Sequence, residues 1–284
     1  MTQPVRSIDL HVHTDYSDGT LSPAQVVEYS IAQGLAAIAI TDHDSVEAIP
    51  PALAAAVGRS VEVIPGIELS ADDQGREIHI LGLLIEWRSP LLQERLAALR
   101  AARRARILEM ISRLNRRGIA LNADDVLQLS SGDASLGRLH VARALCCRGI
   151  VGSIPEAFTR FIGSKGPCYV PHAAFSAQEA IALVRAVDGI PVLAHPGISL
   201  CDELISQMVV DGLRGIEIMH SEHSVQAQLR YTDIARAQGL LFSGGSDCHG
   251  TGKGAPRIGS VRVPYEYLEA MKRAKETGCR LHAP

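Results

Sequence analysis

Two histidines separated by a single residue follow a short apolar run near the start of the chain. His11 and His13 lie in the segment 8–14, and side chains alternate across a β-strand, so both imidazoles face the same side. Asp18 follows among turn residues, which allows its carboxylate to return toward the two ring nitrogens. Two imidazoles and a carboxylate suit a metal ion. The alternative is a pair of histidines that only make hydrogen bonds at a strand end.

Similar side chains follow, or lie within, the other apolar segments of the chain. Because the carboxyl ends of strands meet at one face of an α/β fold, we expect these side chains to converge. With the first three they make six imidazoles and three carboxylates, too many for one tetrahedral zinc and suited to two or three ions. The additional candidates are His43 after 35–40, Glu68 after 61–64, His79 within 78–84, His195 after 190–194, and Asp247 and His249 after 240–242.

Other polar side chains accompany these motifs. Asp42 and Asp44 flank His43, and we expect them to orient imidazoles. His220 and His223 could each be a metal ligand, a general acid, a phosphate contact or an ordinary histidine at the start of a helix. His172 has no assigned role.

The elements that must position these residues follow from the periodicity of the chain. Apolar strands alternate with helical segments, which is typical of an α/β protein with a largely parallel sheet. Between residues 92 and 167 the periodicity is helical and no strand interrupts it. We therefore expect a core made of residues 1–91 and 168–284, which carries the metal site, and a helical insertion over 92–167.

The composition excludes several classes of protein. The net charge of -3 excludes a strongly basic nucleic-acid binder, and the aromatic content of 4% leaves few stacking platforms for single-stranded nucleic acid. No apolar run is long enough to span a membrane and no signal segment begins the chain, so we expect a cytoplasmic protein without membrane contact. Arginines cluster between Arg95 and Arg117, which favours a small phosphorylated ligand there. No obligate protein partner is inferred.

The candidate residues occur in motifs that resemble those of the PHP (polymerase and histidinol phosphatase) family of metal-dependent phosphoesterases. The motifs are His11-Val12-His13 with Asp18, Thr41-Asp42-His43-Asp44, Gly66-Ile67-Glu68, His79, Ala194-His195-Pro196 and Ser246-Asp247-Cys248-His249. The resemblance covers nearly the whole chain. It implies a distorted (β/α)7 barrel with two or three divalent metal ions, manganese in the first place and iron(II) or zinc as alternatives.

By this resemblance the nine candidates form three sets of metal ligands, two of which share Glu68. The sets are His11, His13, Glu68 and Asp247 for one ion, Glu68, His79 and His195 for a second, and Asp18, His43 and His249 for a third. Asp247, Glu68 and His195 would be the catalytic residues. The ions would activate a bound water for attack on phosphorus and hold the phosphoryl oxygens.

Three segments of the insertion, 103–114, 135–145 and 163–170, resemble a branch of the family that acts on 3',5'-bisphosphorylated nucleosides such as pAp and on short RNA 5' ends. This implies a phosphoric monoester hydrolase whose small nucleotide substrate loses its 3'-phosphate. The second phosphate would need fixed cations away from the metals. Our candidates for binding it are Arg103, Arg106, Ser135, Arg138 and Lys165, for which an ordinary solvated surface is the alternative.

Other functions stay open at this point. Two are enzymatic: a 5'-3' exoribonuclease on short RNA, and a phosphatase for another small ester such as histidinol phosphate. A third is a non-catalytic metal-binding accessory domain, against which the complete set of ligands argues.

Overall fold

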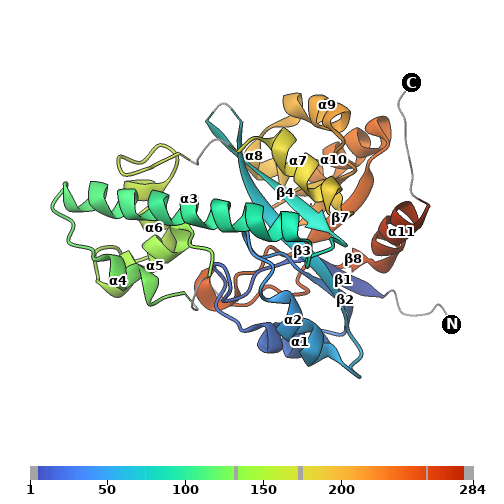
Figure 1. Cartoon of the computed structure of the whole chain (residues 1–284), viewed down its shortest axis with the longest axis horizontal. Helices are drawn as coiled ribbons and strands as arrows, with labels where there is room; N and C mark the ends of the chain where they lie inside the picture. The colour runs from blue at the N-terminus through green and yellow to red at the C-terminus, as the bar shows by residue number, and fades with distance from the viewer. Residues whose placement is uncertain (1–5, 74, 131–133, 172–174, 254, 278–284) are drawn as a thin grey trace.

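The computed structural model describes residues 6–73, 75–130, 134–171, 175–253 and 255–277. In these residues, eight strands form one sheet in the order β7-β6-β5-β4-β3-β2-β1-β8. The sheet curls until β7 packs against β1, which gives a nearly closed barrel with helices around it (Figure 1). This confirms the expected α/β barrel. The strands are β1 Ser7–Val12, β2 Leu35–Ile40, β3 Glu62–Asp73, β4 Arg76–Leu83, β5 Ile190–Leu193, β6 Gly215–His220, β7 Leu241–Gly245 and β8 Val263–Pro264.

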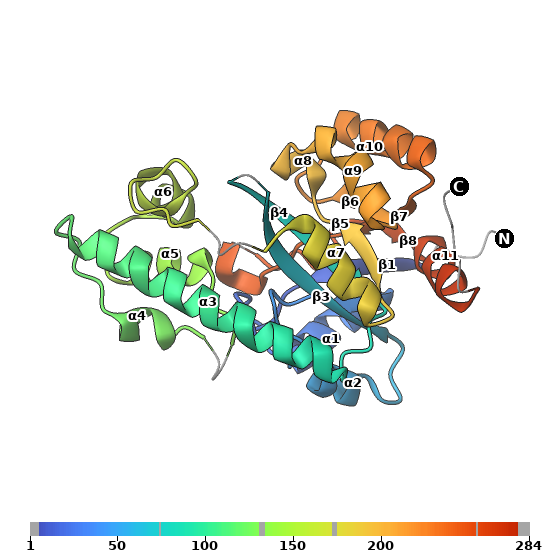
Figure 2. The same ribbon diagram turned by 45° about the horizontal axis from the view of Figure 1, so that its top comes forward.

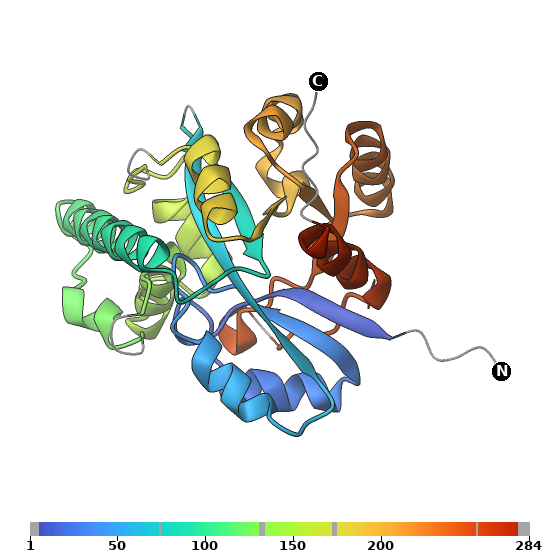
Figure 3. The same ribbon diagram turned by 45° about the vertical axis from the view of Figure 1, so that its right-hand side comes forward.

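Helices cover the outside of the barrel in separate groups (Figure 3). The amphipathic helices bury their apolar stripes against the sheet, as α7 does with Ile181 and Val184. Side-chain caps begin several of them, for example Ser22 at α1 and Ser176 at α7. The helices around the barrel are α1 Pro23–Ala32, α2 Ile49–Ala56, α7 Ala177–Ala186, α8 Pro196–Ser199, α9 Asp202–Asp211, α10 Val225–Gln238 and α11 Tyr265–Glu276.

The sheet departs from the expected parallel pattern at two strands, β4 and the short β8, which pairs antiparallel with β1. β4 runs antiparallel to both β3 and β5, whereas β1, β2, β5, β6 and β7 pair with their neighbours among them in parallel. β3 pairs with β2 through Pro65 and then continues with β4 as far as Asp73, so it is longer than the predicted segment 61–64. Because β4 is reversed, its beginning lies at the end of the barrel where the parallel strands finish.

The helices from α3 to η1 lie together on the side of the barrel away from α11 (Figures 1 and 2). They enclose a hydrophobic core of their own, with Ile107, Met110, Val141 and Leu145 at its centre. The boundaries 92 and 167 of the insertion stay a prediction, and the first of these helices begins at Pro90. The elements are α3 Pro90–Asn115, α4 Ala123–Leu127, α5 Arg138–Cys147, α6 Ile154–Ala157 and the π-helical turn η1 Phe158–Ile162.

Polar contacts close the barrel between its first and last long strands. The carboxylate of Asp9 in β1 accepts hydrogen bonds from the N–H groups of Ser246, at 2.8 Å, and Gly259, at 2.9 Å. Gly245 at the end of β7 has no room for a side chain, since a Cβ there would lie 2.4 Å from Cβ of His11. The close approach brings the residues after β7 beside those of β1. Among the described helices, none combines the length and apolarity needed to cross a membrane.

Candidate metal centre

The first group of side chains gathers where β1, β3 and the segment after β7 meet. His11 lies in β1 and His13 follows one residue after its end, so their rings point the same way. The Nε2 atoms of His11 and His13 lie 3.2 and 3.1 Å from Oε2 of Glu68. They lie 3.5 and 3.1 Å from Oδ1 of Asp247. A tetrahedral ion with bonds of about 2 Å sets its ligand atoms roughly 3.3 Å apart, so these four atoms fit one ion.

The hydrogen bonding of these atoms supports a cation at this point. Among the described residues, Nε2 of His11, Nε2 of His13 and Oε2 of Glu68 are buried, and although the two nitrogens lie 3.2 and 3.1 Å from that oxygen, none of the three atoms has a contact with hydrogen-bond geometry. A buried polar atom without a partner costs roughly 1–3 kcal/mol, so such atoms are rare and need an explanation. A bound metal ion would satisfy all three atoms at once.

Glu68 reaches a second group of side chains through its other oxygen. Oε1 lies 2.7 Å from Nδ1 of His79 and 3.1 Å from Nε2 of His195. His79 belongs to β4 and reaches this end of the barrel because that strand is reversed. His195 follows β5 and begins α8. The two oxygens of Glu68 are therefore placed to bridge two ions.

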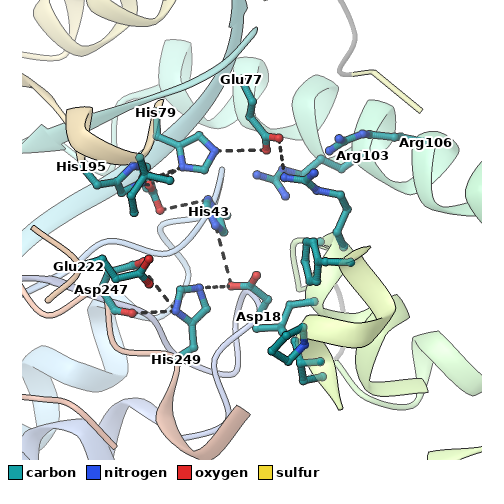
Figure 4. Close-up of a pocket in the computed structure, with 18 residues that line it drawn as sticks. Asp18, His43, Glu77, His79, Arg103, Arg106, His195, Glu222, Asp247 and His249 are labelled. Carbon is teal, nitrogen blue, oxygen red and sulfur yellow. Dashed lines mark hydrogen bonds and ion pairs between the residues drawn. The ribbon is translucent and has the colours of Figure 1, made fainter. Parts of the chain in front are cut away.

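A third group forms around Asp18 in the loop after β1. Oδ1 of Asp18 lies 3.2 Å from Nε2 of His249 and 4.0 Å from Nε2 of His43 (Figure 4). The ring of His13 stacks on that of His249 with centroids 4.2 Å apart, which joins this group to the first. Eight of the nine residues predicted as ligands thus lie in linked, mostly buried groups, and His195 joins them through its contact with Glu68.

The charged groups of the cluster shift one another's pKa values. Burial acts to raise the pKa of Glu68, but the imidazoles of His43 and His79 hold it well below its usual value. Burial acts to lower the pKa of His13, but Asp247 and Glu68 raise it to about 9. Glu68 is therefore ionised at neutral pH, and a metal bound at His13 would displace a proton.

The backbone is strained at two of the candidate ligands. His195 has a φ of 26° and Asp247 a φ of 51°, values that residues with a Cβ rarely adopt. Such strain persists only where the surrounding structure requires it, and it is concentrated at functional sites.

One carboxylate that holds the cluster together was not among our sequence candidates. Oε1 of Glu217 in β6 lies 3.2 Å from Nδ1 of His11, and its Oε2 accepts a hydrogen bond of 2.8 Å from N–H of His195. Glu217 therefore orients the ring of His11, whose Nε2 faces the first group, and it fixes the backbone of His195. Its signal in the sequence is an acid inside the apolar segment 215–219.

The two acids beside His43 have different partners. Asp44 does not orient an imidazole, because its carboxylate accepts hydrogen bonds from Nε of Arg103 and from N–H of Ser70. The carboxylate of Asp42 accepts from N–H and Oγ of Thr14, both at 2.7 Å. Asp42 also accepts from Oγ of Ser17, which lies 3.4 Å from Nδ1 of His13, so it reaches an imidazole through that hydroxyl. Asp44 instead fixes Arg103 and the backbone of Ser70.

The histidines left open by the sequence have different surroundings. His223 is structural, because Nδ1 lies 2.8 Å from the carbonyl oxygen of Ile218 and Nε2 accepts from N–H of Gly197 at 3.1 Å. Nδ1 of His220 accepts from the N–H of Glu222, which leaves its Nε2 3.8 Å from Oδ2 of Asp247. His172 lies outside the described residues.

A cavity of about 700 Å³ joins the metal cluster to the insertion (Figure 4). One side carries ligands of all three groups, and the other carries arginines of α3 and α5 with Glu77 of β4 between them. The apolar part of its lining consists of Leu139, Ile154, Pro155, Phe158 and Ile198.

Three of the five residues predicted to bind substrate line this cavity. They are Arg103, Arg106 and Arg138. Arg103 is buried and donates to Asp44, to Oγ of Ser70 and to the carbonyl oxygen of Leu136. Arg106 donates from Nε to the carbonyl oxygen of Val170 at 2.7 Å, and Nη2 of Arg138 donates to Oε2 of Glu77 at 2.5 Å.

The other two residues lie away from the cavity. Ser135 is buried, and its N–H donates to the carbonyl oxygen of Tyr16 at 3.1 Å. Lys165 is exposed in the turn after η1. Neither is among the residues that line the cavity.

Comparison with known proteins places this geometry in a family. The PHP domain family model matches residues 9–136. The chain is 32% identical over 258 residues to the 3',5'-nucleoside bisphosphate phosphatase of Chromobacterium violaceum, covering 89% of this chain and 90% of the relative. It is 32% identical over 259 residues to the phosphoribosyl 1,2-cyclic phosphate 1,2-diphosphodiesterase of Eggerthella lenta, covering 90% and 98%.

Two further proteins are similar over most of their length. The 5'-3' exoribonuclease Rnm of Escherichia coli is 32% identical over 248 residues, covering 85% of this chain and 84% of the relative. A crystal structure from Bifidobacterium adolescentis, proposed to be a metal-dependent phosphoesterase, superposes with a TM-score of 0.87 at 31% identity, covering 94% of this chain and 96% of that one. With the barrel and its histidine and carboxylate cluster, this similarity shows that the chain belongs to the PHP family of metal-dependent phosphoesterases.

Proposed function

We propose that this protein is a phosphatase that removes the 3'-phosphate from 3',5'-bisphosphorylated nucleosides, such as pAp. The observation that supports it most directly is the cavity shared by the metal cluster and the arginines of the insertion. A simple phosphate ester needs only the metal side of such a site, whereas cations on the far side suit a second anionic group. The volume of about 700 Å³ is in the range of small-molecule sites.

We propose that the metal ligands divide as the family resemblance implies. Divalent ions would lower the pKa of a bound water and neutralise charge on the phosphoryl oxygens; manganese is our first candidate. Glu68, Asp247 and His195 are the proposed catalytic residues, since each would bind metal and border the position of the phosphate. The three proposed sets are His11, His13, Glu68 and Asp247, then Glu68, His79 and His195, and then Asp18, His43 and His249.

The arginines offer the second phosphate a concentrated positive charge. Burial, together with the nearby guanidinium groups of Arg138 and Arg103, lowers the pKa of Arg106 to about 10. Arg106 stays charged at neutral pH, and a bound dianion would relieve the repulsion among the three groups. Arg103 also anchors the insertion to the barrel through Asp44, so Arg106 and Arg138 are our main candidates for direct contact.

Steady-state phosphate release tests the proposal. Manganese-loaded protein would be compared on pAp, AMP, histidinol phosphate and a 5'-phosphorylated dinucleotide, with the Asp247→Ala variant as a blank. We expect kcat/KM to be highest for pAp. Equal values for pAp and AMP would contradict a second-phosphate site.

A 5'-3' exoribonuclease is the second candidate, supported by the similarity to a relative of that name. Preference for the dinucleotide over pAp would favour it. Turnover of none of the four esters would leave the accessory metal-binding domain as the remaining proposal. The cytoplasmic location expected from the sequence stays a prediction.

A further inference from the structure

Glu77 stands between the metal cluster and the arginines of the insertion. It lies in β4 two residues before His79, so both side chains leave the same face of the strand. Oε1 of Glu77 lies 3.3 Å from Nε2 of His79 (Figure 4). Its Oε2 lies 2.5 Å from Nη2 of Arg138. One oxygen of this carboxylate thus contacts the metal side of the cavity, and the other contacts the arginine side.

The contact with His79 concerns the metal side. Nδ1 of His79 faces Glu68 and the proposed second ion, at 2.7 Å from Oε1 of Glu68. An imidazole that gives one nitrogen to a metal carries its proton on the other, and a carboxylate that accepts this proton fixes the plane of the ring. Glu77 is the acceptor placed for that purpose.

The contact with Arg138 concerns the substrate side. Arg138 is the first residue of α5, and its guanidinium carbon lies 5.4 Å from the ring centroid of Phe158 and 5.6 Å from that of Tyr169. These two rings lie beside the guanidinium group of Arg138. Oε2 of Glu77 accepts from one of its nitrogens and so fixes the direction in which the guanidinium points. Through these two contacts Glu77 connects His79, a candidate ligand in the barrel, to Arg138, a cation of the insertion.

We propose that Glu77 is a positioning residue that holds Arg138 at a set distance from the metal centre. The Arg138 part of this inference rests on the proposed function, which assigns that residue to the second phosphate. A fixed spacing between the two phosphate positions would favour a 3',5'-bisphosphate over its 2',5' isomer. These two substrates have the same base and the same charge and differ only in geometry.

The test uses Glu77→Gln, whose amide has a single acceptor oxygen and cannot serve both partners. Glu109→Gln, on the exposed face of α3 and paired with Arg113, is the matched control. Two quantities would be measured in full-length protein: the dissociation constant of Mn²⁺ by calorimetric titration, and the ratio of kcat/KM for the 3',5' and 2',5' isomers.

We expect Glu77→Gln to weaken Mn²⁺ binding roughly 10- to 100-fold, as loss of a partner of a metal-bound histidine does. We also expect its isomer ratio to fall at least about tenfold, the scale of one lost hydrogen bond to a charged group. Arg138→Ala should lower the ratio while leaving Mn²⁺ affinity as in the wild type. Glu109→Gln should change neither quantity.

A folded Glu77→Gln variant with wild-type Mn²⁺ affinity and wild-type isomer ratio would overturn the proposal. A change in only one quantity would overturn the coupling between the two sites. If the wild type does not prefer pAp to AMP, the proposed function fails together with the Arg138 part. The His79 part would then stand or fall on the Mn²⁺ titration.

Discussion

At the scale of single residues, Glu68 is the most heavily shared side chain of the cluster. Its Oε2 lies within 3.2 Å of nitrogens of His11, His13 and His43, and its Oε1 contacts His79 and His195. A single buried carboxylate therefore faces five imidazoles. Its negative charge would help to bind every proposed ion that it contacts.

Replacing Glu68 by Gln should remove metal and activity together. The amide keeps the volume but loses the charge and one acceptor oxygen, and a direct ligand should matter more than the 10- to 100-fold typical of its outer partners. We expect phosphate release to fall by more than about a hundredfold. Metal content by elemental analysis checks the cause, and a folded variant with full metal content would contradict it.

Arg138 should affect binding more than chemistry. Arg138→Ala should raise the KM for pAp about 10- to 100-fold, the range for a lost hydrogen bond to a charged group, with little change for AMP. Arg160→Ala is the matched control, since Arg160 pairs with Glu156 on the surface of the same insertion. Equal losses on pAp and AMP would argue against a second-phosphate role.

At the scale of elements, α5 connects the insertion to the metal centre. Its N-terminal turn is closed by Nδ1 of His140, which accepts from N–H of Gly137 at 3.0 Å. Further along, Nη2 of Arg143 donates to the carbonyl oxygen of Asp18 at 2.6 Å. The helix therefore holds the loop that presents a candidate ligand, and its stability bears on the site.

The start of α5 should make the protein sensitive to acid. Burial lowers the pKa of His140 to about 4 from the model-peptide value of 6.5. The unfolded chain then binds more protons than the folded one between these values, so stability is full above pH 6.5 and is lost as pH falls toward 4. The stability lost by pH 5 through this group amounts to about 2 kcal/mol.

The variant His140→Asn tests this, because its Oδ1 can replace Nδ1 as the acceptor for Gly137 but does not titrate. We expect its free energy of unfolding in urea to drop by about 2 kcal/mol less than that of the wild type between pH 7 and pH 5. Parallel declines would show that His140 is not the responsible group.

At the scale of the whole molecule, the metal centre joins segments from all round the barrel. Its candidate ligands come from β1, β3 and β4 and from the segments that follow β1, β2, β5 and β7. The cavity beside them lies between the barrel and the insertion, each with its own hydrophobic core. Metal binding should therefore stabilise the barrel as a unit.

Removing metal should lower the melting temperature, and returning it should restore the original value. At a thousandfold excess over its dissociation constant, a bound ion adds about 4 kcal/mol to the stability of the folded state. Calorimetry of protein treated with a chelator, with and without added Mn²⁺, measures the difference. Identical melting temperatures in the two samples would contradict a metal centre built from these residues.

Local patterns in the sequence were enough to predict an α/β fold and the nine candidate ligands, and the family resemblance added the barrel. The alternation of side chains along a strand depends on backbone geometry alone, so it places His11 and His13 on one side wherever the strand lies. The order of strands and helices, and the helical periodicity of the insertion, are short-range features of the same kind.

The partners of the charged side chains depended on the tertiary structure. Glu77 looks like an ordinary strand residue in the sequence, and Glu217 stands out only as an acid inside an apolar segment. Their partners follow from the reversed pairing of β4 and the position of β6. Arg103 meets Asp44, 59 residues earlier in the chain, while Lys165 lies away from the cavity. Distances between segments far apart in the chain are set by how the elements pack, and no local periodicity records them.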